Sequence, residues 1–194
     1  MTELALLRHG HTPWNREGRL QGRTDIPLDP EARATLAALR LPTPWDGAEL
    51  WSSPLSRAIE TAELVAGRSP RTDPALTEMN WGLWEGKKRL ALVDDPEADY
   101  RDIDDWSWHY RPPQGESPAE LRERLIPWAE RLQNHSVAVC HIGVMRVFLA
   151  HATGWDFEGP APFRIKRNRL YRLTIDGNSW STSPDPIRLE ERTT

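Results

Sequence analysis

Short apolar runs that end in polar residues recur along the chain and predict buried strands. Three of them are residues 3–10 (ELALLRHG), 47–54 (GAELWSSP) and 136–143 (SVAVCHIG). Each is short and apolar at its centre, as in strands that are covered on both faces of a parallel sheet. Residues 169–181 instead alternate apolar and polar positions around an Asp-Gly-Asn turn, which predicts a hairpin or an edge strand.

Helical patterns alternate with these strands. We expect helices over residues 28–40, 54–67, 117–134 and 144–154. The first begins with Asp29 as N-cap and Pro30 at the first helical position. In the third, Ser117 and Glu120 form a capping box, and Pro127 predicts a kink. Alternating strands and helices indicate the α/β class, here a three-layer α/β/α sandwich with a mostly parallel central sheet.

Residues 80–115 differ from the rest because they are rich in charge and tryptophan and contain one short helical pattern, around residues 88–93. We interpret residues about 87–112 as a lid-like insertion into a single domain that spans 1–194. The terminal segment 183–194 (SPDPIRLEERTT) combines charges with prolines, and we expect a loose tail there.

Composition narrows the class of protein. The 25 Lys and Arg residues against 29 Asp and Glu residues give a net charge of -4, so we expect neither nucleic acid nor an anionic membrane as partner. Cys140 is the only cysteine, which excludes an intrachain disulfide. The sequence contains no signal-peptide pattern and no apolar stretch of transmembrane length. We therefore expect a cytoplasmic protein, and the sequence leaves its oligomeric state open.

Chemistry-bearing residues follow the strand ends, where α/β sheets gather functional groups. Arg8, His9, Thr12 and Asn15 follow the first strand, Arg57 follows the second and His141 ends the third. Arginine pairs bind phosphate or carboxylate oxygens, and histidine can itself accept a phosphoryl group. The sequence has no G-x-S-x-G elbow and no P-loop. These residue types favour phosphoryl chemistry over acyl transfer.

We expect no metal and no cofactor. Arg8 and Arg57 would oppose a bound cation, and the sequence contains neither an H-x-x-x-H pair nor a cysteine cluster.

Five motifs occur in the order in which the histidine phosphatase superfamily, also called the phosphoglycerate mutase-like family, has them. They are LLRHGHTPWN (6–15), LQGRTDIPL (20–28), SSPLSRAIETA (52–62), LTEMNWGLWEG (76–86), and GES (115–117) with HIGVMR (141–146). The chain resembles this family over residues 4 to about 150. It is most similar to the small phosphatases of the family, such as the alpha-ribazole-5'-phosphate phosphatases.

The resemblance implies a role for each matched residue. His9 would be the phosphorylated nucleophile, and Glu78 would be the general acid for the leaving oxygen and then the base for water. Both roles set physical conditions: His9 needs its other ring N–H held by a carbonyl, and Glu78 needs a raised pKa from burial beside Trp81 and Trp84. Arg8, Arg57 and His141 would hold the phosphoryl oxygens with help from Asn15, and Thr12, Gln21 and Gly22 would line the substrate side.

Two positions depart from the family pattern: His11 stands where glutamate is usual, and Ile142 where glycine is usual. The side chain of Ile142 could narrow the pocket, although its backbone N–H remains.

Three functions stay open: a phosphomonoesterase for a small-molecule phosphate ester, a 2,3-bisphosphoglycerate-dependent phosphoglycerate mutase, and a non-catalytic member that binds a phosphorylated ligand. Seven acidic residues in the insertion disfavour small polyanions and favour the phosphatase. They are Asp94, Asp95, Glu97, Asp99, Asp102, Asp104 and Asp105.

Overall fold

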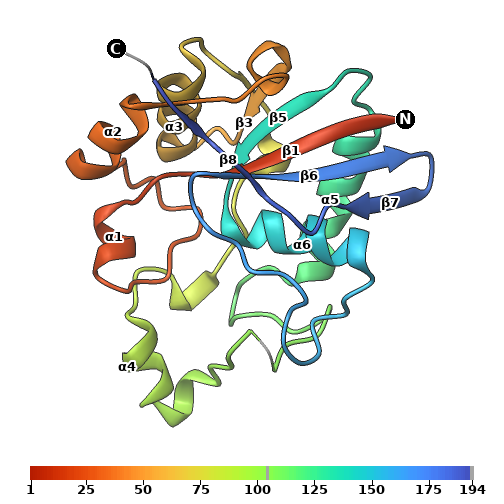
Figure 1. The fold of residues 1–194 in the computed structure, drawn as a ribbon. Helices are drawn as coiled ribbons and strands as arrows, with labels where there is room; N and C mark the ends of the chain where they lie inside the picture. Colours follow the sequence, from red (N-terminus) through yellow and green to blue (C-terminus); the bar gives the residue numbers. More distant parts are fainter. Residues whose placement is uncertain (104, 193–194) are drawn as a thin grey trace.

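A mixed sheet of seven strands forms the centre of the computed structural model, which describes residues 1–103 and 105–192 (Figure 1). The strand order is β4-β3-β5-β1-β6-β7, with β8 also paired to β6. β4, β3, β5 and β1 run parallel to one another, whereas β6 is antiparallel to β1, β7 and β8. The strands are β1 (Thr2–Arg8), β3 (Glu49–Ser52), β4 (Arg71–Thr72), β5 (Ser136–Cys140), β6 (Arg169–Asp176), β7 (Ser179–Thr182) and β8 (Ile187–Arg188).

Helices cover both faces of this sheet, so the structure is the expected three-layer sandwich. The α-helices are α1 (Pro13–Arg16), α2 (Pro30–Ala37), α3 (Ser56–Ala66), α4 (Arg89–Val93), α5 (Pro118–Glu130) and α6 (Ile142–Thr153). Short 3-10 turns are η1 (Trp45–Gly47), η2 (Pro74–Leu76), η3 (Gly82–Trp84) and η4 (Pro96–Ala98). Figure 1 shows α2 and α3 on one side of the strands and α5 and α6 on the other.

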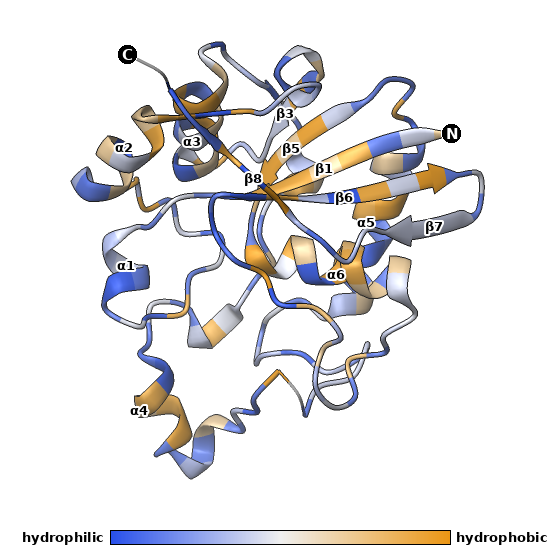
Figure 2. Ribbon diagram, viewed as in Figure 1, coloured by the Kyte–Doolittle hydropathy of each residue, from blue (hydrophilic) through white to orange (hydrophobic). Residues whose placement is uncertain are grey.

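Two cores result from the alternation of side chains along β1. Ala5 and Leu7 belong to the core beneath α2 and α3, whereas Leu4 and Leu6 belong to the core beneath α5 and α6. All four side chains are fully buried. Figure 2 shows apolar residues along β1, β5 and α6. Such two-sided burial explains why β1 and β5 are short apolar runs in the sequence.

The predicted helix signals are present in the structure. Asp29 caps α2 by accepting a hydrogen bond from the Ala32 N–H at 2.7 Å. Ser117 and Glu120 form the capping box of α5, which contains Pro127. α3 begins at Ser56, two residues later than predicted, and ends at Gly67 in the left-handed conformation (φ 67°).

Aromatic residues organise the inserted segment, which lies at one end of the molecule (Figure 1). Trp84 contacts Tyr100 with ring centroids 5.0 Å apart, and Trp106 contacts Trp81 at 5.5 Å and Tyr110 at 5.0 Å. The tryptophan-rich composition therefore packs the inserted segment onto the core beneath α5 and α6. Asp104, which we counted among the acidic residues of this segment, lies outside the described residues.

The prediction of a loose tail over residues 183–194 is wrong for most of that segment. Ile187–Arg188 pairs with β6 as β8, and β9 (Glu190–Glu191) pairs with β2 (Leu39–Arg40) in a separate two-stranded sheet. Leu189, between the two strands, is buried in the core beneath α2 and α3.

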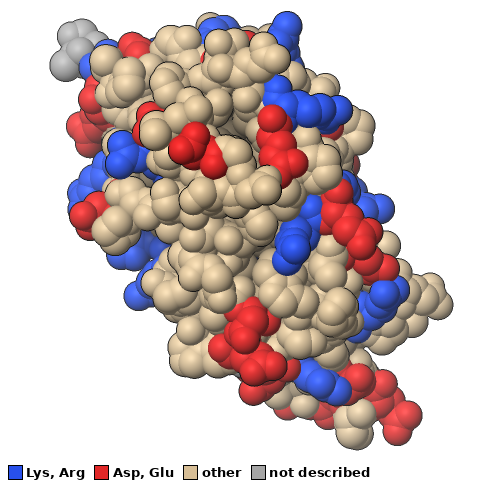
Figure 3. Space-filling view, turned by 90° about the vertical axis from the view of Figure 1, so that its right-hand side faces the viewer, with Lys and Arg blue, Asp and Glu red and all other residues tan. Residues whose placement is uncertain are grey.

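On the face that Figure 3 shows, acidic and basic side chains are mixed rather than gathered by sign. Within the part of the chain that the structure describes, no helix is long and apolar enough to cross a membrane.

Candidate active site

His9 follows β1 and is held with one ring nitrogen available for chemistry. Its Nδ1 lies 2.6 Å from the carbonyl of Gly10, and a carbonyl only accepts, so Nδ1 carries the proton and Nε2 presents a lone pair. Burial, followed by the charges of His141 and the nearby arginines, lowers the pKa of His9 well below its ordinary value. The ring is therefore neutral, as a nucleophile must be. This is the carbonyl contact that the sequence analysis expects.

The loop after His9 is fastened to α3. The Gly10 N–H donates to the Thr61 hydroxyl at 3.0 Å, and that hydroxyl donates to the Arg57 carbonyl at 2.7 Å. A side chain on Gly10 would meet the Leu36 methyl at 2.7 Å, so a larger residue here would have to push Leu36 aside. The carbonyl that orients His9 thus belongs to a fixed piece of backbone.

Arg57 and His141 lie behind the nucleophile, and both are fully buried. The rings of His9 and His141 are 5.1 Å apart, and Arg57 Nε donates to His141 Nδ1 at 3.3 Å. His141 Nε2 consequently carries its proton and donates to Ser53 Oγ at 2.8 Å. Burial and the arginines lower the pKa of His141 well below its ordinary value. The two histidines and Arg57 converge as the sequence analysis expects.

Loop carbonyls hold the other end of the Arg57 guanidinium. It donates to the carbonyl of Gly22 at 2.6 Å and to that of Thr24 at 3.0 Å. A side chain on Gly22 would come within 2.9 Å of the Met79 carbonyl and of Trp81. Gly22 therefore places a carbonyl where Arg57 can reach it, which is a structural reason for the glycine in LQGRTDIPL.

Thr12 orients the side-chain amides of Asn15 and Gln21. The Thr12 hydroxyl caps α1 and donates to Gln21 Oε1 at 3.0 Å, and Asn15 Oδ1 accepts from the Thr12 N–H at 3.2 Å. Both amide oxygens are thereby engaged, so the NH₂ groups are the donors left to face the cavity that Asn15 and Gln21 line. Thr12 does not line it and acts on the site through Gln21.

Two buried donors in the cavity wall have no hydrogen-bond partner among the described residues: Arg8 Nε and Gln21 Nε2. Buried donors are normally satisfied, so an unpaired set in one wall indicates where an acceptor binds. Burial, together with Arg146, lowers the pKa of Arg8 to about 10, against an opposing effect of Glu78. The guanidinium nevertheless stays charged near neutral pH. An anion beside His9 would satisfy these donors.

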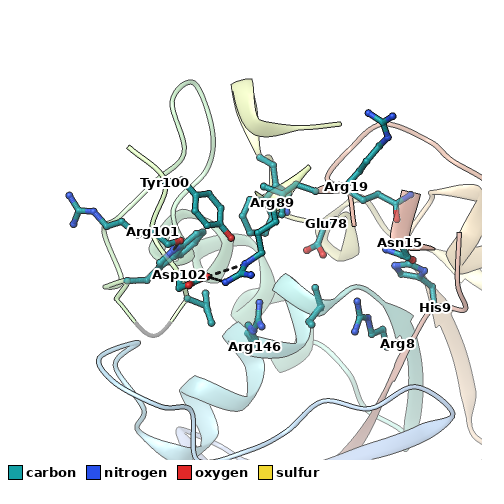
Figure 4. Close-up of a pocket in the computed structure, with 16 residues that line it drawn as sticks. Arg8, His9, Asn15, Arg19, Glu78, Arg89, Tyr100, Arg101, Asp102 and Arg146 are labelled. Atoms are coloured by element: carbon teal, nitrogen blue, oxygen red, sulfur yellow. Dashed lines mark hydrogen bonds and ion pairs between the residues drawn. The ribbon is translucent and has the colours of Figure 1, made fainter. Parts of the chain in front are cut away.

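Glu78 lies opposite Arg8 and is almost completely buried (Figure 4). Its carboxylate accepts from the Met79 N–H at 2.8 Å and from the Gly143 N–H in the first turn of α6 at 3.1 Å. These bonds and the arginines favour the charged form, but desolvation outweighs them and raises the pKa of Glu78. The carboxyl can therefore hold a proton for transfer, as the sequence analysis expects.

Sequence reasoning missed Arg167, which precedes β6. Its Nε donates to the His9 carbonyl at 3.1 Å, and a terminal nitrogen donates to Asn15 Oδ1 at 3.0 Å. Burial and neighbouring arginines lower its pKa to about 9. Its place follows only from the strand pairing: β6 is antiparallel to β1 with Leu170 opposite Leu7, so the residues before β6 lie at the edge that carries His9.

Arg124 on α5 was also missed. It donates to both carboxylate oxygens of Glu116 at 3.1 Å and to the Glu78 carbonyl at 3.3 Å. The Glu116 carboxylate also accepts from the Asn80 N–H at 3.1 Å. Arg124 therefore fixes the backbone on both sides of the general-acid candidate.

These elements enclose a cavity of about 250 Å³ (Figure 4). At one end it is lined by Arg8, His9, Asn15, Gln21 and Glu78. Its remaining walls are apolar and aromatic residues, four arginines and one aspartate, namely Leu20, Trp81, Tyr100, Ile103, Trp106, Ile142, Arg19, Arg89, Arg101, Arg146 and Asp102. Arg57 and His141 lie outside this lining set, behind His9. His11 is on the rim of a different hollow beside Arg167.

The inserted segment does not make this cavity acidic. Of its acidic residues in the described part of the chain, Asp102 alone lines the cavity, and it is ion-paired with Arg89. Arg101, also in the lining, stacks over the Tyr110 ring at 4.6 Å. The acidic residues of the insertion therefore do not exclude small polyanions from the cavity, because arginines outnumber acidic residues in its lining.

The arrangement can accept a phosphoryl group and move a proton. A neutral His9 Nε2 faces a cavity with cationic and amide donors on one side and a protonatable carboxyl on the other. Within the described residues, no group of three or more His, Cys, Asp or Glu side chains is placed to hold a metal ion.

Comparison with known proteins gives one family. Residues 4–183 match the family model described as the histidine phosphatase superfamily (branch 1). The "Probable phosphoglycerate mutase GpmB" of Escherichia fergusonii is 36% identical over 200 residues, which cover 94% of this chain and 89% of that protein. Among solved structures, TTHB049 from Thermus thermophilus is 34% identical with a TM-score of 0.72, covering 98% of this chain and 99% of that one. A phosphoglycerate mutase from the same organism is 36% identical with a TM-score of 0.70, at the same coverage.

Proposed function

Since this chain belongs to the histidine phosphatase superfamily, we propose that it hydrolyses a small-molecule phosphate monoester through a phosphohistidine on His9. The observation that carries the proposal is the orientation of His9: a carbonyl holds Nδ1–H, which leaves Nε2 for chemistry, and His9 lines the same cavity as Arg8 and Gln21 with their unpaired donors Nε and Nε2. That combination presents a nucleophile and binds the oxygens of its target in one place.

In the first step, the lone pair of His9 Nε2 attacks phosphorus as the ester P–O bond breaks. The leaving oxygen takes the proton of Glu78, whose raised pKa favours the protonated form that this step needs. Arg8, Asn15 and Gln21 donate to the equatorial oxygens, where charge accumulates in the transition state. Arg57 stands behind His9 and adds positive charge, and the neutral His141 ring receives a hydrogen bond from it.

In the second step, Glu78 takes a proton from water, the water oxygen attacks phosphorus, and the P–N bond breaks. Inorganic phosphate leaves and His9 is neutral again. Leu20, Trp81 and Trp106 in the cavity wall suit an alcohol with an apolar or ring-shaped body.

Phosphoglycerate mutase is the second candidate. Two relatives that are named phosphoglycerate mutases support it. Arg89 and Arg146 also line the cavity, where they could bind a second anionic group of the substrate. Both candidates share the first step and differ in the acceptor, which is water in one and a substrate hydroxyl in the other.

A ³¹P NMR time course separates them. The protein is incubated with a panel of phosphomonoesters, and in parallel with 3-phosphoglycerate plus catalytic 2,3-bisphosphoglycerate. Inorganic phosphate that accumulates from the panel, and is absent with His9→Ala, supports the phosphatase. Interconversion of 2- and 3-phosphoglycerate without phosphate release supports the mutase. Activity that persists in His9→Ala would contradict both.

A further inference from the structure

A second hollow adjoins the catalytic cavity. It has a volume of about 320 Å³, and three of its lining residues also line the catalytic cavity: Ile103, Ile142 and Arg146. These side chains therefore stand between the two spaces. The far wall of the second hollow is the segment 160–165, which includes Phe163 and Arg164.

Ile142 contributes an apolar side chain to this partition. It is the first residue of α6, directly after His141, and its side chain is partly exposed. Arg146 lies four residues later, on the same face of the helix. A glycine at position 142, which is usual at this point of the motif, would leave no side chain between the two spaces.

The second hollow is positively charged and partly apolar. Arg146 and Arg164 are its charged lining residues, and Pro160 and Phe163 are among its apolar ones. Arg164 is exposed and has no ion-pair partner in the described part of the chain. The Tyr171 hydroxyl fixes this wall: it donates to the Arg164 carbonyl at 2.8 Å and accepts from the Lys166 N–H at 2.6 Å.

We propose that the second hollow is a distal subsite for an anionic group at the far end of the substrate, and that Ile142 sets how long the substrate must be to reach it. The proposal rests on the proposed function in one respect: the phosphoryl group to be transferred occupies the His9 end. An apolar connecting chain would pass over Ile142 and Ile103, and the anion would pair with Arg164 and Arg146.

The test uses ω-carboxyalkyl phosphates of increasing chain length, each compared with the uncharged alkyl phosphate of the same length. Binding is measured by calorimetry to His9→Ala, which holds the esters without the nucleophile, and turnover is measured with the wild type. We expect the carboxylated ester to bind about fivefold more tightly once the chain passes a threshold length, as for a partly exposed ion pair.

Four variants locate that preference. Arg164→Gln should remove it, whereas Lys166→Gln, a matched change on the same segment but outside the hollow's lining, should leave it unchanged. Ile142→Gly should move the threshold to shorter chains, and Ile142→Ala should move it less.

Two results would overturn the subsite: no carboxylate preference at any length, or a preference that survives undiminished in Arg164→Gln, because the proposal assigns the anion to that side chain. Failure of the proposed function would give a different experimental result. The wild type would then release no phosphate from any ester, while the binding series would still report on Arg164.

Discussion

Arg167 donates a hydrogen bond to Asn15 Oδ1 at 3.0 Å while its Nε binds the carbonyl of His9 at 3.1 Å. One half-buried guanidinium thus ties the nucleophile's backbone to an amide that lines the same cavity. Its pKa, lowered to about 9, shows that the folded protein destabilises this charge. A bound phosphoryl group would offset that cost, so substrate and Arg167 should stabilise each other.

Arg167→Gln should lower kcat/KM by about 10- to 100-fold, because a neutral, shorter side chain cannot hold both acceptors and the charge-assisted bonds are lost. Arg167→Lys should restore little, because an ammonium lacks the fork that spans the two oxygens. The measurement is steady-state hydrolysis of a phosphomonoester. Arg172→Gln, on β6 beside Glu3 and away from the cavity, is the control. Full activity in Arg167→Gln would show that Asn15 and His9 need no such support.

Gly143 is required because Glu78 packs directly against it. A Cβ at this position would overlap Glu78 Oε1, and the Gly143 N–H is a donor to the same carboxyl. Gly143→Ala should therefore displace Glu78 and lower kcat for alkyl phosphates by about 100-fold, the range expected for loss of a general acid. Nitrophenyl phosphates, whose leaving group needs little protonation, should be affected much less. Gly47→Ala, where a Cβ meets nothing within 4 Å, is the matched control. Equal losses for both ester classes would argue for a general disruption of the site.

Local signals in the sequence were sufficient for most of the architecture. Asp29 and the pair Ser117 and Glu120 cap helices through contacts within a few residues, so their chemistry can be read along the chain. The β8 and β9 strands could not be found in this way. Each has two residues, too few for a hydrophobic period, and each depends on a partner strand far away in the sequence.

The site residues divide in the same way, into those that a local motif identifies and those that only a distant strand pairing puts in place. His9, Arg57 and Glu78 stand in recognisable motifs, whereas Arg167 stands in a run of basic residues and gains its position only when β6 pairs with β1. The prediction that the insertion's acidic residues disfavour small polyanions was wrong at the cavity for a similar reason. Composition counts every acidic residue in residues 87–112, but the fold turns Arg89 inward and pairs Asp102 with it.

Cys140 offers a probe of this packing. It is fully buried at the end of β5, and burial raises the pKa of its thiol, so it should be inert in the native protein. A thiol reagent such as DTNB should modify less than a tenth of the chains in the time that urea-unfolded protein reacts completely, at one thiol per chain. Rapid modification without denaturant would mean that β5 opens readily, which would contradict its place between β1 and β3.

The raised pKa of Glu78 predicts a pH-dependent cost in stability. Below the ordinary carboxyl value of 4.5 the group is protonated in the folded and the unfolded chain alike. As the pH rises through that value, the unfolded chain releases its proton while the folded chain retains it, so the free energy of unfolding falls until the pH passes the raised folded pKa. Glu78→Gln has no proton to release, and the buried histidines titrate equally in both proteins. Urea unfolding at a series of pH values should therefore show the difference, variant minus wild type, growing in favour of the variant from pH 4 upward. Glutamine can satisfy only one of the two N–H donors, which shifts that difference by a constant and leaves its slope unchanged. A difference that stays flat across this range would mean that Glu78 titrates in the folded protein like an exposed carboxyl, and could not be the acid that protonates the leaving oxygen.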